Sequence, residues 1–133
     1  MQMGIGAMLH YLSGGSENSA EKYYGKKIKD AKIDDNRLRL TFEDGVSIDV
    51  WDDGQSCCES RYMSTDDDLR ALIGDTLTRI EAKQGPEIEH DYEVHEQAFV
   101  EIGTDKGFVT IVNHNEHNGY YGGFGLTITE NGL

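Results

Sequence analysis

Residues 36–51 read NRLRLTFEDGVSIDVW, and this stretch decides the fold class. Leu38 and Leu40 alternate with charged side chains, and the same spacing of apolar residues returns in the second half of the stretch. Such a period of two places one face of a strand in a core and the other in water. Asp44-Gly45, between the two halves, is a hairpin turn signal. We therefore predict an antiparallel hairpin with one buried face.

Similar strand signals continue along the chain. We expect further strands at residues 28–33, 76–83, 94–102, 108–112 and 124–129. Gly85-Pro86 is expected to end the strand before it, and residues 87–93 to form an acidic loop.

One short helix is expected near residues 65–73. Ser64 or Thr65 can cap it, three aspartates follow where a helix N-terminus favours negative charge, and Gly74 suits its end. Sequential strands with one helix indicate an α+β fold with a mostly antiparallel sheet. Residues 25–133 are expected to form this single domain. Residues 1–24 are expected to be an N-terminal arm that is mobile or packs on another subunit.

The composition is acidic, with 12 Lys and Arg against 25 Asp and Glu and a formal net charge of −13. This charge disfavours direct nucleic-acid binding, because such binding relies on neutralising phosphates. A solubilising surface explains the acidity best, and mimicry of nucleic acid towards a basic partner protein is the alternative. No apolar run is long enough to cross a bilayer, so we expect a cytoplasmic protein without a membrane partner.

Two segments carry most of the binding chemistry, WDDGQSCCESRY at residues 51–62 and NHNEHNGYYGGF at residues 113–124. Both mix aromatic rings with amides and charges, so we interpret them as the walls of one site. The rings can stack on a planar ligand, the amides can read its edges, and Arg61 can hold a phosphate as a fork. The predicted ligand-binding residues are Trp51, Asp53, Gln55, Glu59, Arg61, Asn113, His114, Asn115, His117, Asn118, Tyr120 and Tyr121.

Two catalytic alternatives use the same segments. His114 and His117 with Cys57, Cys58 and Glu59 offer zinc ligands, and either cysteine with a histidine offers a nucleophile and its base. Adjacent cysteines in an extended segment point apart, and the spacing matches no common metal motif. We therefore predict no metal, no cofactor and no catalytic residue, and we favour a protein that is not an enzyme.

Four segments together resemble a family of small proteins that are common in bacteriophages and prophages and are classed as a domain of unknown function. They are Gly25-Lys26-Lys27-Ile28, Asp52-Asp53-Gly54-Gln55-Ser56-Cys57-Cys58-Glu59-Ser60, Asp66-Asp67-Asp68-Leu69 and Asn118-Gly119-Tyr120-Tyr121. The resemblance covers about residues 25–130, and the Cys-Cys-Glu-Ser and Asn-Gly-Tyr-Tyr elements are its most distinctive parts. By analogy of size, source and pocket chemistry, the chain is similar in kind to phage anti-defence proteins of the Thoeris type. Those proteins sequester cyclic nucleotide signals without cleaving them, often between subunits.

Three functional hypotheses follow. The first is a non-enzymatic, phage-type anti-defence protein, a homo-oligomer in the host cytoplasm, that sequesters a small nucleotide-like immune signal of the cyclic nucleotide or cyclic ADP-ribose type. The second is an acidic inhibitor that binds a host defence protein or CRISPR nuclease. The third is a hydrolase that uses a cysteine and a histidine.

Overall fold

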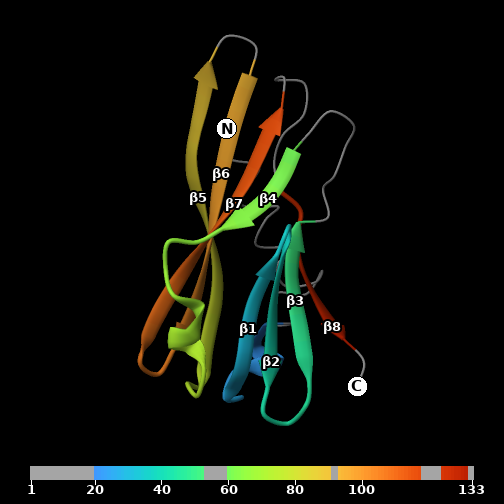
Figure 1. Cartoon of the computed structure of the whole chain (residues 1–133), viewed down its shortest axis with the longest axis vertical. Coiled ribbons are helices and arrows are strands. Elements are labelled where there is room, and N and C mark those ends of the chain that lie inside the picture. The colour runs from blue at the N-terminus through green and yellow to red at the C-terminus, as the bar shows by residue number, and fades with distance from the viewer. Residues whose placement is uncertain (1–19, 53–59, 91–92, 118–123, 132–133) are drawn as a thin grey trace.

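The structure, a computed structural model, describes residues 20–52, 60–90, 93–117 and 124–131 (Figure 1). In these ranges the chain forms two four-stranded antiparallel sheets. The first sheet has the order β1 (Ile28–Asp34), β2 (Arg37–Phe42), β3 (Ser47–Asp52) and β8 (Leu126–Asn131). The second has the order β4 (Ser60–Ser64), β7 (Gly107–His117), β6 (Glu93–Thr104) and β5 (Leu77–His90).

The hairpin expected from residues 36–51 is confirmed as β2 and β3. Leu38 pairs with Val50 and Leu40 with Ile48, and all four side chains are fully buried. Gly45 completes the turn at a φ of 91°, a left-handed conformation that favours glycine. The mostly antiparallel sheet predicted from the sequence is therefore present.

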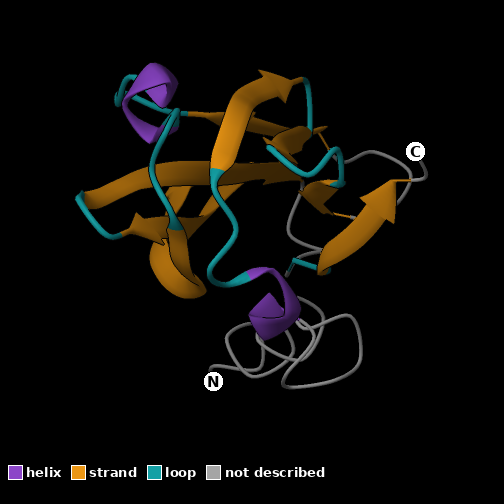
Figure 2. Ribbon diagram, turned by 90° about the horizontal axis from the view of Figure 1, so that it is seen from below, coloured by secondary structure: helices purple, strands orange, loops and turns teal. Residues whose placement is uncertain are grey.

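The apolar faces of the two sheets share one hydrophobic core. Phe42 of β2 and Ile111 of β7 are both fully buried in it. Tyr23 adds to it from the 3-10 turn η1 (Ala20–Tyr23), with its ring stacked on Phe42 at a centroid distance of 6.0 Å. Figure 2 shows the two 3-10 turns of the described chain at different margins of the strand layers.

The predicted helix at residues 65–73 is wrong, and so is the α+β class for the described residues, which hold two 3-10 turns and no α-helix. Only η2 (Leu69–Leu72) is helical, and Asp68 caps it by accepting a hydrogen bond from the Arg70 backbone N–H. Thr65 instead donates to the Thr110 carbonyl of β7 at 2.6 Å. The Thr65 hydroxyl also accepts a hydrogen bond from the Asp67 backbone N–H at 3.1 Å, but the helical turn starts only after Asp68.

The strand break predicted at Gly85-Pro86 is also wrong. Strand β5 continues to His90, with a register shift between Gln84 and Glu87, and the expected loop at residues 87–93 is largely strand. β5 lies at the edge of its sheet, where a proline that lacks an N–H is tolerated at a bulge. Among the described residues no helix is long and apolar enough to cross a membrane.

Candidate ligand site

The topology places the described ends of the two ligand-rich segments next to one another. Strand β3 ends at Asp52 and β4 begins at Ser60, whereas β7 ends at His117 and β8 begins at Leu126. Asp52 pairs with Leu126, and Ser60 pairs with Glu116. One connection joins β3 to β4, and the other joins β7 to β8. Because β3 pairs with β8 and β4 pairs with β7, the anchor points of the two connections lie side by side.

A buried ion pair joins these anchor points. Arg61 Nη1 lies 2.6 Å from Asp52 Oδ2, and the two side chains are 2% and 1% exposed. The other carboxylate oxygen of Asp52 accepts a hydrogen bond from the Gly125 backbone N–H at 2.9 Å. The first connection begins after Asp52 and ends before Arg61, and Gly125 lies just after the second connection. Asp52 thus contacts residues at the ends of both connections. We call this group, Asp52, Arg61 and the Gly125 amide, the loop-base cluster.

The inner face of β7 changes from apolar to polar near these anchors. Val109 and Ile111 belong to the core, whereas Asn113, Asn115 and His117 continue the same face and are also buried. Figure 1 shows that the second sheet extends past the end of the first.

Two of these inner-face residues have defined contacts on β6. The Asn113 side-chain amide donates to the Ala98 carbonyl at 3.2 Å, and His117 Nε2 lies 2.8 Å from Glu96 Oε1. Asn113 Oδ1 is buried and accepts no hydrogen bond from the described residues. A buried carbonyl oxygen without a donor is costly, so a ligand N–H or a water would be stabilised there.

His114 lies on the opposite face of β7 in a second polar cluster. Its Nε2 is 2.8 Å from Ser64 Oγ, and its Nδ1 is 2.9 Å from His95 Nε2. Tyr62 stacks on the His114 ring at a centroid distance of 4.4 Å. Desolvation, followed by the proximity of His95, lowers the pKa of His114. Contacts with Ser64, His95 and Tyr62 therefore hold the His114 ring on the outer face of β7, away from Asn113 and Asn115.

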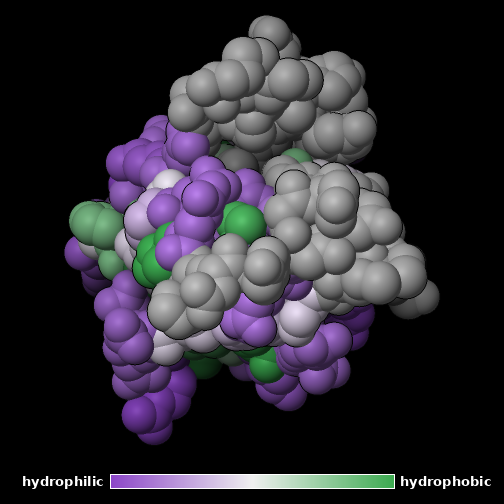
Figure 3. All heavy atoms as spheres, turned by 90° about the horizontal axis from the view of Figure 1, so that it is seen from above, coloured by the Kyte–Doolittle hydropathy of each residue, from purple (hydrophilic) through white to green (hydrophobic). Residues whose placement is uncertain are grey.

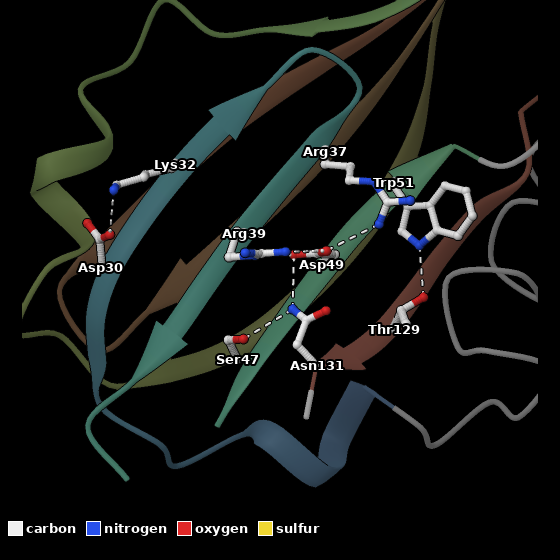
Figure 4. Close-up of polar contacts among 9 residues, drawn as sticks. All are labelled: Asp30, Lys32, Arg37, Arg39, Ser47, Asp49, Trp51, Thr129 and Asn131. Atoms are coloured by element: carbon white, nitrogen blue, oxygen red, sulfur yellow. Dashed lines mark hydrogen bonds and ion pairs between the residues drawn. The ribbon is translucent and has the colours of Figure 1, made fainter. Parts of the chain in front are cut away.

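Trp51 lies on the outer face of the first sheet, again apart from the loop-base cluster. Its indole Nε1–H donates to Thr129 Oγ1 at 2.8 Å, and the Arg37 guanidinium lies 4.2 Å from the ring centroid (Figure 4). The structure thus brings Arg61, Asn113, Asn115 and His117 together on one inner face. It separates Trp51 and His114 from them.

The remaining predicted site residues lie outside the described residues. They are Asp53, Gln55, Glu59, Asn118, Tyr120 and Tyr121. Cys57 and Cys58 also lie there, so the thiol and zinc alternatives keep their status as hypotheses. Within the described ranges, no group of three or more His, Cys, Asp or Glu side chains is arranged to hold a metal ion.

The described surface carries a pocket and a few exposed apolar side chains away from the loop-base cluster. A pocket of about 250 Å³ lies at the other end of β7, lined in part by Leu72, Thr104 and Phe108, and no predicted ligand residue lines it. On the end shown in Figure 3, the described surface is mainly hydrophilic. Among the described residues, the exposed large apolar side chains are Ile73 just after η2, Ile88 on β5 and Phe108 on β7.

Sequence reasoning missed three groups that organise these faces. It did not single out Asp52 or Glu96, and it placed Asp49 on the wet face of the hairpin, where the structure finds it 1% exposed. Asp49 is covered by arginines from the neighbouring strand. The burial of Asp49 could have been predicted from the hairpin itself, because its register places Arg39 directly opposite Asp49.

The fold defines a class of small two-sheet β proteins that carry two polar connections anchored at one end. The chain belongs to the family described as domain of unknown function DUF7448, whose model matches residues 21–126. No curated protein and no solved structure matches the chain.

Proposed function

We propose that this chain is a non-enzymatic binding protein that sequesters a small nucleotide-like ligand at the end where residues 53–59 and 118–123 are anchored. The observation that carries the proposal is the paired register of Asp52 with Leu126 and of Ser60 with Glu116. This register holds the strand ends that flank the two segments side by side.

In this proposal the inner face of β7 forms the floor of the site. The buried Asn113 Oδ1 supplies an acceptor suited to a ring N–H, and Tyr120 and Tyr121 supply rings for stacking. Arg61 takes a different part from the phosphate fork expected from the sequence. Because its charge is buried against Asp52, it positions the connections and does not present a cation to the ligand.

The ligand class proposed is a cyclic nucleotide or a cyclic ADP-ribose type signal, bound by a homo-oligomer in a host cytoplasm. The support is the resemblance to small phage proteins and the analogy with anti-defence proteins that hold such signals.

The test is native mass spectrometry of the purified protein with a panel of cyclic nucleotides and cyclic ADP-ribose isomers. We expect a nucleotide adduct of unchanged ligand mass on a defined oligomer. Tyr120→Ala/Tyr121→Ala should lose the adduct, whereas Arg70→Ala, an exposed arginine on η2, should keep it. Absence of any adduct, or a ligand released with altered mass, would refute sequestration.

An acidic protein-binding inhibitor is the second candidate. Glu87, Glu89 and Glu93 are exposed around the paired ends of β5 and β6, which extend past the first sheet in Figure 1. Clustered carboxylates of this kind suit a basic protein surface. A complex with a defence protein that weakens steeply with salt, in a chain that binds no nucleotide, would favour this candidate.

A further inference from the structure

Two arginines share the outer face of the first sheet. Arg37 and Arg39 are two residues apart on β2, so their side chains leave the same face of the strand. In register on β3 they face Trp51 and Asp49. Figure 4 shows both guanidinium groups directed towards Asp49.

Asp49 holds both guanidinium groups in place through hydrogen bonds. Arg39 donates from Nε to Asp49 Oδ1 at 2.8 Å and from Nη2 to Oδ2 at 3.1 Å. Arg37 Nη1 donates to Oδ2 at 3.2 Å, and the Asn131 side-chain amide donates to Oδ1 at 3.2 Å. The carboxylate is therefore saturated with donors, which lowers the pKa of Asp49, chiefly through Arg39.

Most of the arginine donors remain unused. A guanidinium carries about five N–H donors, and beyond Asp49 neither arginine donates to another group in the described part of the chain. The two side chains are 47% and 55% exposed. Arg37 also stacks on Trp51, whose indole N–H is tied to Thr129. The two forks are thus held in place while their outer edges face water.

The charges around the pair nearly balance. Asp49 offsets one of the two arginines, Lys32 is 3.6 Å from Asp30, and Asp34 lies opposite Arg37 in register. This neutral setting contrasts with the net charge of −13 for the whole chain. An anion here would be held mainly by directed hydrogen bonds to two fixed forks, the arrangement that suits phosphate oxygens.

We propose that Arg37 and Arg39 form a binding site for a phosphate-type oxyanion beside the Trp51 ring. This site lies on the outer face of the first sheet and does not depend on the proposed function. The shared chemistry is that of free phosphate groups and of the phosphates of a nucleotide.

The test uses Trp51, the single tryptophan of the chain, as the reporter. Inorganic pyrophosphate is titrated at low ionic strength while tryptophan fluorescence and the Arg Nε–H NMR signals are followed. We expect saturable changes in both, weakened by added salt. Arg37→Ala should weaken the affinity about ten-fold or more, since a hydrogen bond to a charged group contributes about 1.5–3 kcal/mol. Arg70→Ala, the matched control on η2, should leave it unchanged.

Further variants keep the result interpretable. Arg37→Lys retains the charge but not the fork, so it should bind more weakly than the parent protein even where it is fully folded.

A nucleoside diphosphate that binds more tightly than pyrophosphate would identify a nucleotide as the source of the phosphate, and equal affinities would identify a free phosphate. Unchanged fluorescence and NMR signals, or equal affinity in Arg37→Ala, would overturn the proposal.

Discussion

At the scale of single residues, buried charge decides what Arg61 does. The sequence offers Arg61 as a cation inside a ligand-rich segment, but the structure pairs it with Asp52 under nearly complete burial. Removing one member of a buried ion pair leaves the other charge without compensation. Arg61 therefore matters first for stability.

We predict that Arg61→Ala lowers the free energy of unfolding by about 3–5 kcal/mol. Urea denaturation followed by circular dichroism measures this change. Arg70→Ala, which removes an exposed ion pair with Asp68, should leave the stability nearly unchanged, because solvent screens this pair. Equal stabilities of the two variants would show that the loop-base cluster does not hold the connections.

The lowered pKa of His114 determines the direction in which folding stability changes with pH. Its pKa lies below the ordinary value of 6.5, through desolvation first and His95 second, while Glu116 acts in the opposite direction. The unfolded chain then binds the proton more tightly than the folded chain, so folding stability is full above pH 6.5 and falls as the pH drops through the lowered pKa. His95→Ala should raise the His114 pKa towards 6.5 in an NMR titration. A His114 pKa above 6.5 in the unaltered protein would contradict this reading.

At the scale of elements, alternation in the sequence predicted strands well and their interruptions poorly. The β2–β3 hairpin could be predicted because apolar side chains alternate on both sides of Asp44-Gly45. Strand β4 was missed because it has five residues and only Arg61 and Met63 face inwards, one of them charged. The helix at residues 65–73 was overpredicted because Thr65 and Asp67 bind β7, a tertiary contact that no local pattern shows.

The Gly85 bulge in β5 is a packing requirement. A Cβ added at Gly85 would lie 2.9 Å from the Gln97 carbonyl oxygen and 3.1 Å from the Phe99 ring. Because the closest atom belongs to the backbone of β6, relief requires the strands to shift. We expect Gly85→Ala to destabilise the fold by about 1–3 kcal/mol, as measured by urea denaturation. Gln84→Ala, at an exposed neighbour, is the control, and equal effects would contradict the steric account.

At the scale of the whole molecule, the register of the two sheets explains why strand ends that are distant in the sequence lie side by side. Residues 51–62 and 113–124 were judged to form one site from their composition alone. The structure supplies the register that anchors them together, Asp52 with Leu126 and Ser60 with Glu116. Alternation in the hairpin already placed Trp51 on the outer face, together with Asp49. Composition could not show that His114 lies on an outer face, because this depends on which face of β7 joins the core.

The central claim is that residues 53–59 and 118–123 bind one ligand together. Hydrogen exchange followed by mass spectrometry, with and without the panel of cyclic nucleotides and cyclic ADP-ribose isomers, tests this most directly. The account predicts that one ligand slows exchange in both segments at the same concentration, while β1 and β2 exchange unchanged. Protection of only one segment, or of neither with every ligand in the panel, would contradict it.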